Sequence, residues 1–595
     1  MPELQFKGKE FVYNHHLTVP FRPLEMQPDK GIGAPRLDGN LIIHGDNLHA
    51  LKALLPTHAG KVDCIFIDPP YNTGNEGWCY NDNVNSPMIK EWLSSNPIVL
   101  DDGLRHDKWA CMMWPRLKML HELLADEGVI FISIDSIELH TLKLICDEIF
   151  GLANFIGEFV WKSRQNKDNR NENGLSNDHE FILCYGAGLS GEVRSAADYK
   201  NPDKDNRGPW ASGNMVGLAS KESRPNLHYD LINPATGINY GCPRRGWRFE
   251  PSTMTKFIGE KRILWPEKAK GRPRRKVFLD ELPARTNVTS VVNLPIYTNT
   301  GSKCLRDIFG NDAFDFPKPM ELVFHLINLL DRDDLTVLDS FAGSGTTAHA
   351  VLAANARDVG NRRFILVEGE NYADTLTAER VRRVSKGYAF KGVQRDELLR
   401  EPVTFSKLKN ANALLEKVTR IETLDGPKYD RIKPTVKDGV LIVTGERDVA
   451  EATPGLGGDF TYCELGAPIE MDAILSGEGL PDPAAMAGLL WHTATAQPFD
   501  PANMASAPEI GAGVARLGAF AGRTYWLVYR DDLEWLKSGE AALSLSKARA
   551  IATTASGNHL VFAPAKFVSR ELLARERLDV DYAPLPFALY RLETA

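Results

Sequence analysis

Cys64-Ile65-Phe66-Ile67-Asp68-Pro69-Pro70-Tyr71 is the stretch that decides the fold of this 595-residue chain. Its first four residues form a continuous apolar run, which is typical of a parallel strand buried on both faces. The run ends at an acid, two prolines and an aromatic residue, and ligands of open α/β sheets bind at this end of a strand. The stretch therefore predicts a central parallel strand with a site at its carboxyl end.

The four residues after this strand suit the binding of a planar amino group. The Asp68 carboxylate and the Pro69 carbonyl are acceptors that together take both hydrogens of an exocyclic amine. Pro69 and Pro70 restrict the backbone, and Tyr71 offers a flat face on which a flipped base stacks. Bonding both protons returns electron density to the nitrogen and favours its attack on an activated methyl group. The alternative is an ordinary proline-rich turn, although chance gives this tetrapeptide in roughly a few per thousand chains of this length.

Strands and helices alternate around this stretch. Residues 41–44 predict a strand that ends at Gly45-Asp46 and leads into a helix, and residues 129–134 predict another buried strand. Residues 107–126 have helical spacing, with Pro115 expected to kink or restart that helix. The pattern is lost between about 155 and 315 and resumes near 317, with a helix at 320–330 and strands at 336–338 and 364–367. Such alternation predicts a parallel, doubly wound sheet.

A second motif, Asp339-Ser340-Phe341-Ala342-Gly343-Ser344-Gly345-Thr346-Thr347, lies between a predicted strand and a helix. Gly343 and Gly345 let the backbone pass close to a cofactor. No lysine follows the second glycine, which excludes an ATP-type phosphate loop, and the pattern is shorter than a full dinucleotide fingerprint. Glu368 ends the next strand 23 residues after Gly345, where an acid commonly binds ribose hydroxyls. The alternative is an ordinary glycine-rich turn.

The composition is that of a globular chain with several domains. Hydrophobic residues make up 43% and charged residues 25% of the sequence. No apolar run approaches a membrane span, and the N-terminus does not read as a secretory signal. The eight cysteines are scattered without a CxxC pair, so neither a zinc site nor a disulfide framework is expected. A reducing cytoplasm is the expected location.

The net charge of −8 hides a strongly basic segment. Between Arg244 and Lys276 twelve Lys and Arg stand against three acids, with Trp247, Phe249, Phe257 and Trp265 among them. Basic residues interleaved with aromatics suit phosphate contacts and base stacking, whereas the alternative is a solvated surface loop. The residues expected to bind DNA are Arg244, Arg245, Arg248, Lys270, Arg272, Arg274 and Arg275. A second basic stretch from Arg380 to Arg400 either extends this footprint or is the exposed face of a helix.

Together these motifs resemble those of amino-methyltransferases that use S-adenosylmethionine on DNA, in the subgroup where the DPPY element precedes the glycine motif. Four further segments make the chain similar to the modification subunits of type III restriction–modification systems: 71–75, 106–109, 112–117 and 133–135. The resemblance covers most of residues 40–400 and is weaker through 160–310.

The resemblance implies an α/β fold, a circularly permuted Rossmann-like methyltransferase sheet with an inserted target-recognition domain and a C-terminal α+β domain. The implied domains are an N-terminal arm (1–35), a catalytic half (36–154), a target-recognition domain (155–315), a cofactor-binding half (316–400) and a docking or dimerisation domain (401–595). The residues implied to bind S-adenosylmethionine are Asp46, Lys318, Asp339, Phe341, Ala342, Gly343, Gly345, Thr346 and Glu368. For Asp46 a helix N-cap is an equally good interpretation.

The implied activity is transfer of a methyl group to the N6 amino group of adenine in double-stranded DNA. Cytosine-N4 methylation and a catalytically silent recognition subunit are the alternatives. The implied partners are a second copy of the chain and a separate helicase–nuclease restriction subunit. His106, His140 and His179 are interpreted as structural, because the mechanism needs no imidazole. The loop Asn72–Ser86 is hypothesised to close over the flipped base.

Overall fold

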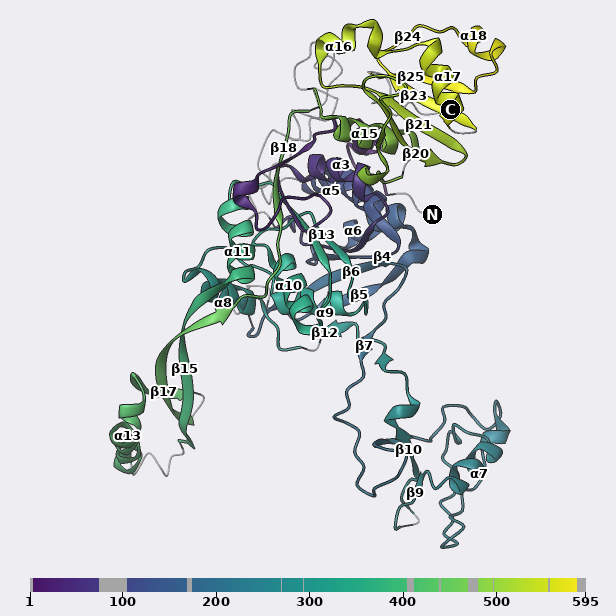
Figure 1. Ribbon diagram of the computed structural model, residues 1–595. Coiled ribbons are helices and arrows are strands. Elements are labelled where there is room, and N and C mark those ends of the chain that lie inside the picture. Colours follow the sequence, from purple (N-terminus) through teal and green to yellow (C-terminus); the bar gives the residue numbers. More distant parts are fainter. Residues whose placement is uncertain are drawn as a thin grey trace. The chain divides into compact units, whose positions relative to one another are not determined.

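The structure, a computed structural model, describes residues 4–73, 104–167, 174–268, 270–292, 294–403, 411–437, 440–468, 480–495, 497–554 and 557–585. It divides into two compact units, one made of Met1–Leu189 with Thr289–Ala595 and the other of Ser190–Val288 (Figure 1). The hypothesised closing loop falls almost entirely outside the described residues. In the part of the chain that is described, no helix is both long and apolar enough to cross a membrane.

A ten-stranded sheet forms the centre of the first unit. Its order is β1-β18-β2-β14-β13-β3-β4-β6-β5-β12. The bounds are β1 Leu24–Met26, β18 Thr461–Leu465, β2 Leu41–His44, β14 Arg363–Glu368, β13 Thr336–Asp339, β3 Val62–Ile67, β4 Leu124–Ile134, β6 Glu180–Gly186, β5 Phe155–Trp161 and β12 Val291–Val292. Strands β18 to β4 run parallel to one another, and β6 runs antiparallel to β4 and β5. The strands predicted near 41, 64, 129, 336 and 364 are therefore confirmed, in a largely parallel sheet.

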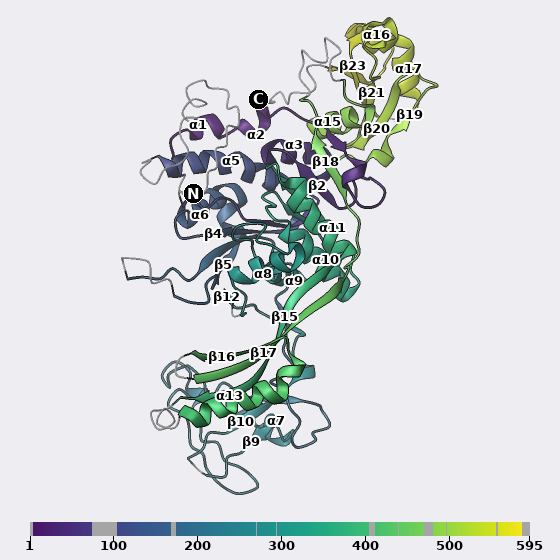
Figure 2. The same cartoon turned by 90° about the vertical axis from the view of Figure 1, so that its left-hand side faces the viewer.

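Helices cover both faces of this sheet (Figure 2). The helices α3 (Asn47–His58), α5 (Arg105–Leu123) and α6 (Leu139–Cys146) share one buried core with alternate residues of the strands, such as Leu41 and Ile43. The helices α9 (Met320–Asn328), α10 (Thr346–Asp358) and α11 (Glu379–Lys386) pack together around β13 and β14. This arrangement is the α/β layering that the alternating pattern predicts.

The expected restart of the helix at Pro115 is wrong, because α5 runs through it from Arg105 to Leu123. A proline removes only one backbone hydrogen bond from a helix. Here Trp109, Met113 and Leu117 are completely buried, so their packing outweighs that loss.

The structure also differs from two expected domain boundaries. Strands β5 and β6 and helix α8 (Thr298–Phe309) belong to the first unit, so the separate unit is 190–288 rather than 155–315. Residues Ile182–Tyr185 of β6 are fully buried, which explains why they join the central core. Strand β15 (Gly387–Pro402) runs through the expected boundary at 400, since it pairs continuously with β17 (Val440–Pro454).

The second unit has a small core of its own. Strands β8 (Trp210–Gly213), β10 (Arg274–Phe278) and β9 (Ile263–Leu264) form one sheet, and β7 (Glu192–Val193) pairs with β11 (Arg285–Thr286). Helix α7 spans Pro251–Gly259. The core residues of this unit are Met215, Leu231, Trp247, Met254 and Ile263.

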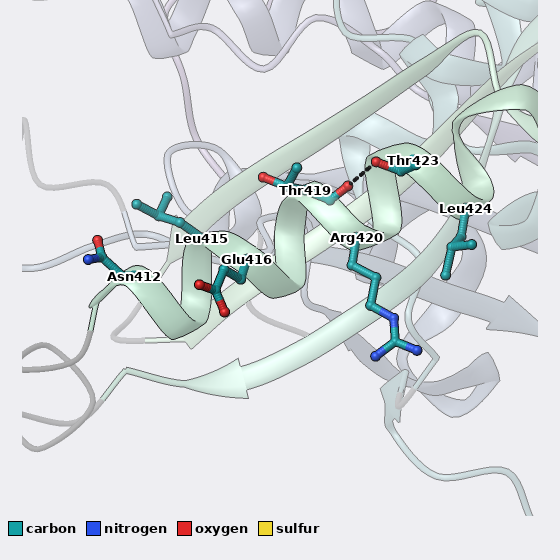
Figure 3. Close-up of a pocket in the computed structure, with 7 residues that line it drawn as sticks. All are labelled: Asn412, Leu415, Glu416, Thr419, Arg420, Thr423 and Leu424. Carbon is teal, nitrogen blue, oxygen red and sulfur yellow. Dashed lines mark hydrogen bonds between the residues drawn. The ribbon is translucent and has the colours of Figure 1, made fainter.

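The residues after α11 form two further substructures. Strands β15, β17 and β16 (Arg431–Lys437) make a three-stranded sheet under helix α13 (Ala411–Asp425). The outer face of α13 lines an open pocket (Figure 3), whose residues are Asn412, Leu415, Glu416, Thr419, Arg420, Thr423 and Leu424. Its lining holds one acid and one base on the same helix and no residue of either motif.

Beyond β18 the chain builds a five-stranded sheet. Its strands are β19 Ala505–Ser506, β20 Val514–Phe520, β21 Arg523–Val528, β23 Asn558–Ala563 and β25 Val580–Pro584, and β22 (Ala542–Leu543) pairs with β24 (Ala565–Lys566). The helices here are α15 Pro483–Thr495, α16 Leu533–Lys537, α17 Leu545–Thr554 and α18 Arg570–Arg575. Helix α15 shares a core with Ala53 of α3. The arm at the start of the chain holds α1 (Lys9–Val12), α2 (His15–Thr18) and β1.

Candidate active site

The predicted site residues gather where four parallel strands end. Asp46 follows β2, Asp68 follows β3, Asp339 ends β13 and Glu368 ends β14. Strands β13 and β3 are neighbours, and the chain leaves them toward opposite sides of the sheet, to β14 and to β4. Ligands of open α/β sheets bind in the crevice at such a topological switch point.

The turn after β3 is held rigidly by its surroundings. The Trp109 indole Nε1 donates a hydrogen bond of 2.7 Å to the carbonyl of Pro70. Asn72 adopts a left-handed conformation with φ of 62°, and its Nδ2 donates to Glu138 Oε1. Glu138 is completely buried and also lies 2.6 Å from the Nδ1 of His106, so that histidine supports the turn. These contacts preorganise the acceptors that precede Asn72.

Asp68 lies in a network of polar side chains. Its Oδ1 accepts hydrogen bonds from the Tyr71 hydroxyl at 2.7 Å and from the Lys318 ammonium at 2.9 Å. The Tyr71 hydroxyl also lies 2.6 Å from the Oγ of Ser133, a fully buried residue of β4. The sequence analysis expected Tyr71 to act through its ring, and its hydroxyl additionally orients the carboxylate of Asp68.

Glu180 is a site residue that the sequence analysis missed. Its Oε2 accepts from the Tyr71 hydroxyl at 3.0 Å and lies 3.2 Å from Lys318 Nζ. Glu180 is the first residue of β6, and β6 is antiparallel, so its amino end lies at the carboxyl ends of the parallel strands. The available signal was an acid directly before the apolar run Phe181–Cys184, but the sequence does not reveal the direction of that strand.

The network keeps its phenol neutral and its amine charged. Burial, followed by the charges of Asp68 and Glu180, raises the pKa of Tyr71 well above its usual value. Burial by itself lowers the pKa of Lys318, but the two carboxylates outweigh it and the pKa is raised overall. Tyr71 therefore donates a proton to hydrogen bonds throughout the physiological pH range, and Lys318 remains an ammonium ion.

The glycine motif forms a tight turn between β13 and α10. Asp339 accepts from the Phe341 amide through Oδ1 and from the Thr347 hydroxyl through Oδ2. The amide of Ala342 donates to the carbonyl of Val367 at 3.0 Å. Gly345 has φ of 76°, which favours glycine, and a Cβ there would lie 3.0 Å from the carbonyl oxygen of Thr377. This glycine is therefore required by the turn itself.

Lys318 connects the two motifs. The Thr346 hydroxyl donates to the Lys318 carbonyl at 3.1 Å, while the Lys318 ammonium contacts Asp68. The two motifs are 270 residues apart in sequence and meet through this one residue. Lys318, which the resemblance implies binds S-adenosylmethionine, therefore lies beside both motifs.

Glu368 is buried beside the same turn. Its Oε2 accepts from the Gly343 amide at 2.7 Å, and its Oε1 accepts from the Glu370 amide at 3.0 Å. Burial raises the pKa of Glu368 to about 7, although these hydrogen bonds by themselves lower it. Burial likewise raises the pKa of Asp339 to about 7. Two acids with pKa values raised to near neutral pH at the ends of adjacent strands are typical of a functional site.

Asp46 performs the structural role that was considered for it. Its Oδ1 accepts from the amides of Leu48 and His49 and so caps α3. Its Oδ2 lies 3.4 Å from the guanidinium of the fully buried Arg116. The carboxylate is 37% exposed, so capping leaves part of it accessible at the sheet edge.

The interpretation of Arg380 as part of a DNA-binding or exposed basic stretch is wrong. This residue is completely buried, and its Nη1 donates to the Ser344 hydroxyl at 3.0 Å and to the Thr346 hydroxyl at 2.8 Å. Its Nη2 lies 3.2 Å from Nδ1 of His349, whose pKa is lowered to about 3 by burial and by Arg380. A neutral histidine is therefore the acceptor. Arg380 stabilises the glycine turn through its hydrogen bonds to Ser344 and Thr346.

The basic unit 190–288 holds the residues expected to bind DNA. Arg244, Arg245, Arg248, Lys270, Arg272 and Arg274 are exposed. Arg275 is different, because its guanidinium lies 4.9 Å from the ring centre of Phe249 and 5.3 Å from that of Phe257. Lys276, counted in the same basic stretch, is buried and paired with Asp203 and Asp205.

Trp247, one of the aromatic residues expected to stack on bases, is not free to do so. Trp247 is 1% exposed and lies in the core of the unit. The ring of Trp265 stacks on Tyr240 at 5.5 Å, and Phe249 packs edge-on against Phe257 at 5.0 Å. A small unit needs large side chains to build a core, and aromatic rings supply that area.

Comparisons with known proteins identify the family of this chain. A family model described as DNA methylase matches residues 62–378. The Mod subunit of the type III restriction-modification enzyme EcoP15I of Escherichia coli is 30% identical over 487 residues, covering 69% of this chain and 73% of that protein. The type II methyltransferase M.KpnI of Klebsiella pneumoniae is 34% identical over 346 residues, covering 55% and 80%.

A third relative is matched over a smaller share of its length. The type III StyLTI Mod subunit of Salmonella typhimurium is 32% identical over 377 residues, which cover 58% of this chain and 57% of that protein. Because the family model matches more than half of the chain and includes both motifs, the chain belongs to the DNA methylase family.

Proposed function

We propose that this chain is a site-specific DNA methyltransferase that transfers a methyl group from S-adenosylmethionine to the N6 amino group of adenine. It acts as the modification and recognition subunit of a type III-like restriction–modification or related defence system. One observation carries the proposal: Lys318 joins the Asp68 carboxylate to the glycine turn at the switch point of a parallel sheet.

The acceptors for the target amine are Asp68 and the carbonyl of Pro69. The neighbouring Pro70 carbonyl already accepts from Trp109, which fixes the turn and leaves the Pro69 carbonyl as the second acceptor. Bonding both hydrogens of the amine to these oxygens raises the nucleophilicity of its nitrogen. Preorganised acceptors contribute because they need no rearrangement when charge develops on that nitrogen.

The residues around the glycine turn fit S-adenosylmethionine. The Ser340 hydroxyl is buried without a partner among the described residues, as expected for a group that awaits a ligand. Gly343 has φ of 50°, which favours glycine, and a Cβ there would already contact the Phe314 ring at 3.5 Å. Glu368 would hold the ribose hydroxyls and Asp46 the adenine. When bound, S-adenosylmethionine supplies the electrophilic methyl group.

The strand order supports a permuted methyltransferase sheet. The cofactor half (β13 and β14) comes late in the chain, yet it lies between β2 and β3, which come early. In the unpermuted order β13 and β14 would be the first two strands, β2 the third and β3 the fourth. The DPPY strand and the glycine strand remain neighbours, as the chemistry requires.

DNA recognition is assigned to the unit 190–288. The whole chain carries −8, but this unit has nineteen Lys and Arg against eleven Asp and Glu. Exposed arginines on a positively charged unit suit contacts with phosphates and base edges. The six exposed residues named above carry this role, and Arg275 contributes through the fold of the unit.

The relatives suggest the partners. Two of them are named as Mod subunits of type III enzymes, which favours a homodimer that works with a separate helicase–nuclease restriction subunit. The region after residue 400 is the proposed docking or dimerisation part of the chain. The relative named as a type II methyltransferase keeps a solitary methyltransferase as the alternative.

The test is modification-sensitive sequencing of DNA from a methylation-free host that expresses this chain or its Asp68→Ala variant. We expect N6-methyladenine within one short motif, and its absence in the variant. N4-methylcytosine in that motif would keep the mechanism and overturn the choice of base. Absence of any modified base with the wild-type chain, together with retained cofactor binding, would favour a catalytically silent recognition subunit.

A further inference from the structure

The Lys318 ammonium lies where the target amino group has to bind. Its Nζ is 2.9 Å from Oδ1 of the Asp68 carboxylate, which is assigned to the amine, and 4.8 Å from the centre of the Tyr71 ring, on which the base is proposed to stack. An ammonium and an exocyclic amine are both nitrogen donors, so in the absence of DNA the lysine satisfies the carboxylate. A base that stacks on the Tyr71 ring and bonds to Asp68 would take the space of this ammonium, so target binding moves the ammonium away.

A second carboxylate is available at this point. Glu180 Oε2 lies 3.2 Å from the same Nζ, and the side chain of Lys318 is only 10% exposed. A buried ammonium that loses its only counter-ion is strongly destabilised. With Glu180 beside it, Lys318 is able to release Asp68 while keeping a carboxylate partner.

We propose that Glu180 is a positioning residue that retains the Lys318 ammonium when the target amino group displaces it from Asp68. The inference rests on the proposed methyltransferase function and extends it, because it assigns a role to a residue outside both motifs. Glu180 also accepts from the Tyr71 hydroxyl, so the same carboxylate holds the aromatic ring in place during the exchange.

The charges make a specific prediction for a double-mutant cycle. In Glu180→Gln the ammonium has Asp68 as its only carboxylate, competes more strongly with the target amine, and slows methyl transfer about 10- to 100-fold. In Lys318→Met the two carboxylates are left without their shared cation, so their mutual repulsion moves Asp68 from its amine-binding position, and transfer also slows. The double variant Glu180→Gln/Lys318→Met has neither a competing ammonium nor a second carboxylate without a cation. Transfer should therefore be faster than in Lys318→Met alone.

The experiment measures single-turnover methylation of a duplex that contains the motif found with the wild-type chain, using full-length protein and labelled S-adenosylmethionine. Cofactor affinity and thermal melting are measured for every variant. Glu158→Gln is the matched control, since Glu158 lies on the adjacent strand β5 opposite Leu183. We expect this control to match the wild type, and Glu180→Gln to bind cofactor within about threefold of it.

Two outcomes would overturn the proposal. The rate loss of the double variant could equal the product of the losses in Glu180→Gln and Lys318→Met. That result would mean that the two residues act independently. A parallel loss of cofactor affinity or melting temperature in Glu180→Gln would mean that Glu180 only maintains the fold. Failure of the proposed function is distinguishable from both, because the wild-type chain itself would then methylate no motif.

Discussion

Glu368 gives the most quantitative prediction, since it is a buried acid that is expected to bind ribose hydroxyls only when ionised. Its two oxygens accept from the amides of Gly343 and Glu370, and the side chain is 7% exposed. Burial raises its pKa from 4.5 to about 7. The perturbation is Glu368→Gln, which keeps the shape of the side chain and removes the titration.

The magnitude follows from the pKa. With a pKa of about 7, about nine-tenths of the protein carries the carboxylate at pH 8 and about one-tenth at pH 6. The affinity for S-adenosylmethionine should therefore fall about tenfold between these pH values. Because the pKa is raised by folding, the effect on stability has the opposite sign: the contribution of Glu368 to the free energy of unfolding is fully present below pH 4.5 and is lost as the pH rises through about 7.

Isothermal titration calorimetry at pH 6, 7 and 8 provides the assay, with buffers of different ionisation enthalpy to count released protons. S-adenosylmethionine has an amino group that also titrates near neutral pH, so the difference between wild type and Glu368→Gln is the decisive quantity. We expect the variant to bind about tenfold more weakly at pH 8 and to lose the additional pH dependence. Glu534→Gln, on the short helix α16 with an 87% exposed side chain, serves as control. An identical pH dependence in wild type and Glu368→Gln would refute the reasoning and point to Asp339.

Three further predictions test the supports of the site. Arg380→Met removes the donor to the glycine turn. We expect the free energy of unfolding to fall by about 3 kcal/mol and cofactor binding to be lost in calorimetry. Unchanged binding would contradict this. Trp109→Phe frees the Pro70 carbonyl, so methylation should slow about tenfold at unchanged cofactor affinity, and equal losses of both would argue against it. Arg244→Ala should weaken DNA binding and reduce its salt dependence without changing the melting temperature, whereas Arg275→Ala should lower the melting temperature of the unit. Melting curves and DNA binding at several salt concentrations distinguish the two variants. A lower melting temperature in Arg244→Ala and weaker DNA binding alone in Arg275→Ala would show that the roles are misassigned.

The central strands and both motifs were predictable because their signals are local. Residues 64–67 and 129–134 are continuous apolar runs, and such runs identify strands that are buried on both faces wherever they lie in the sheet. Asp68 and Gly345 are adjacent in sequence to the strand or helix ends that position them. Pro115 was misjudged, because its cost to the helix is local whereas the packing that overcomes it comes from other elements.

Charge was a weaker guide than apolar pattern. Arg380 and Lys276 read as surface cations in the sequence, yet both are buried in hydrogen-bonded or ionic contacts with residues distant in the chain. The same holds for Trp247, which reads as a stacking residue but forms the core of its unit. The number of Lys and Arg therefore predicted that the unit 190–288 is positively charged. It did not identify which side chains are free to contact DNA.

The sequence by itself determined the parallel sheet, the acceptor motif and the glycine turn, because hydrophobic pattern and backbone restriction act over a few residues. Only the tertiary structure decided that Asp68 and Glu180 share Lys318 as a partner. That contact depends on the antiparallel direction of β6 and on the return of the chain to Lys318 some 250 residues after Asp68. Side-chain electrostatics depend on such distances in space, and these are set by the packing of whole elements.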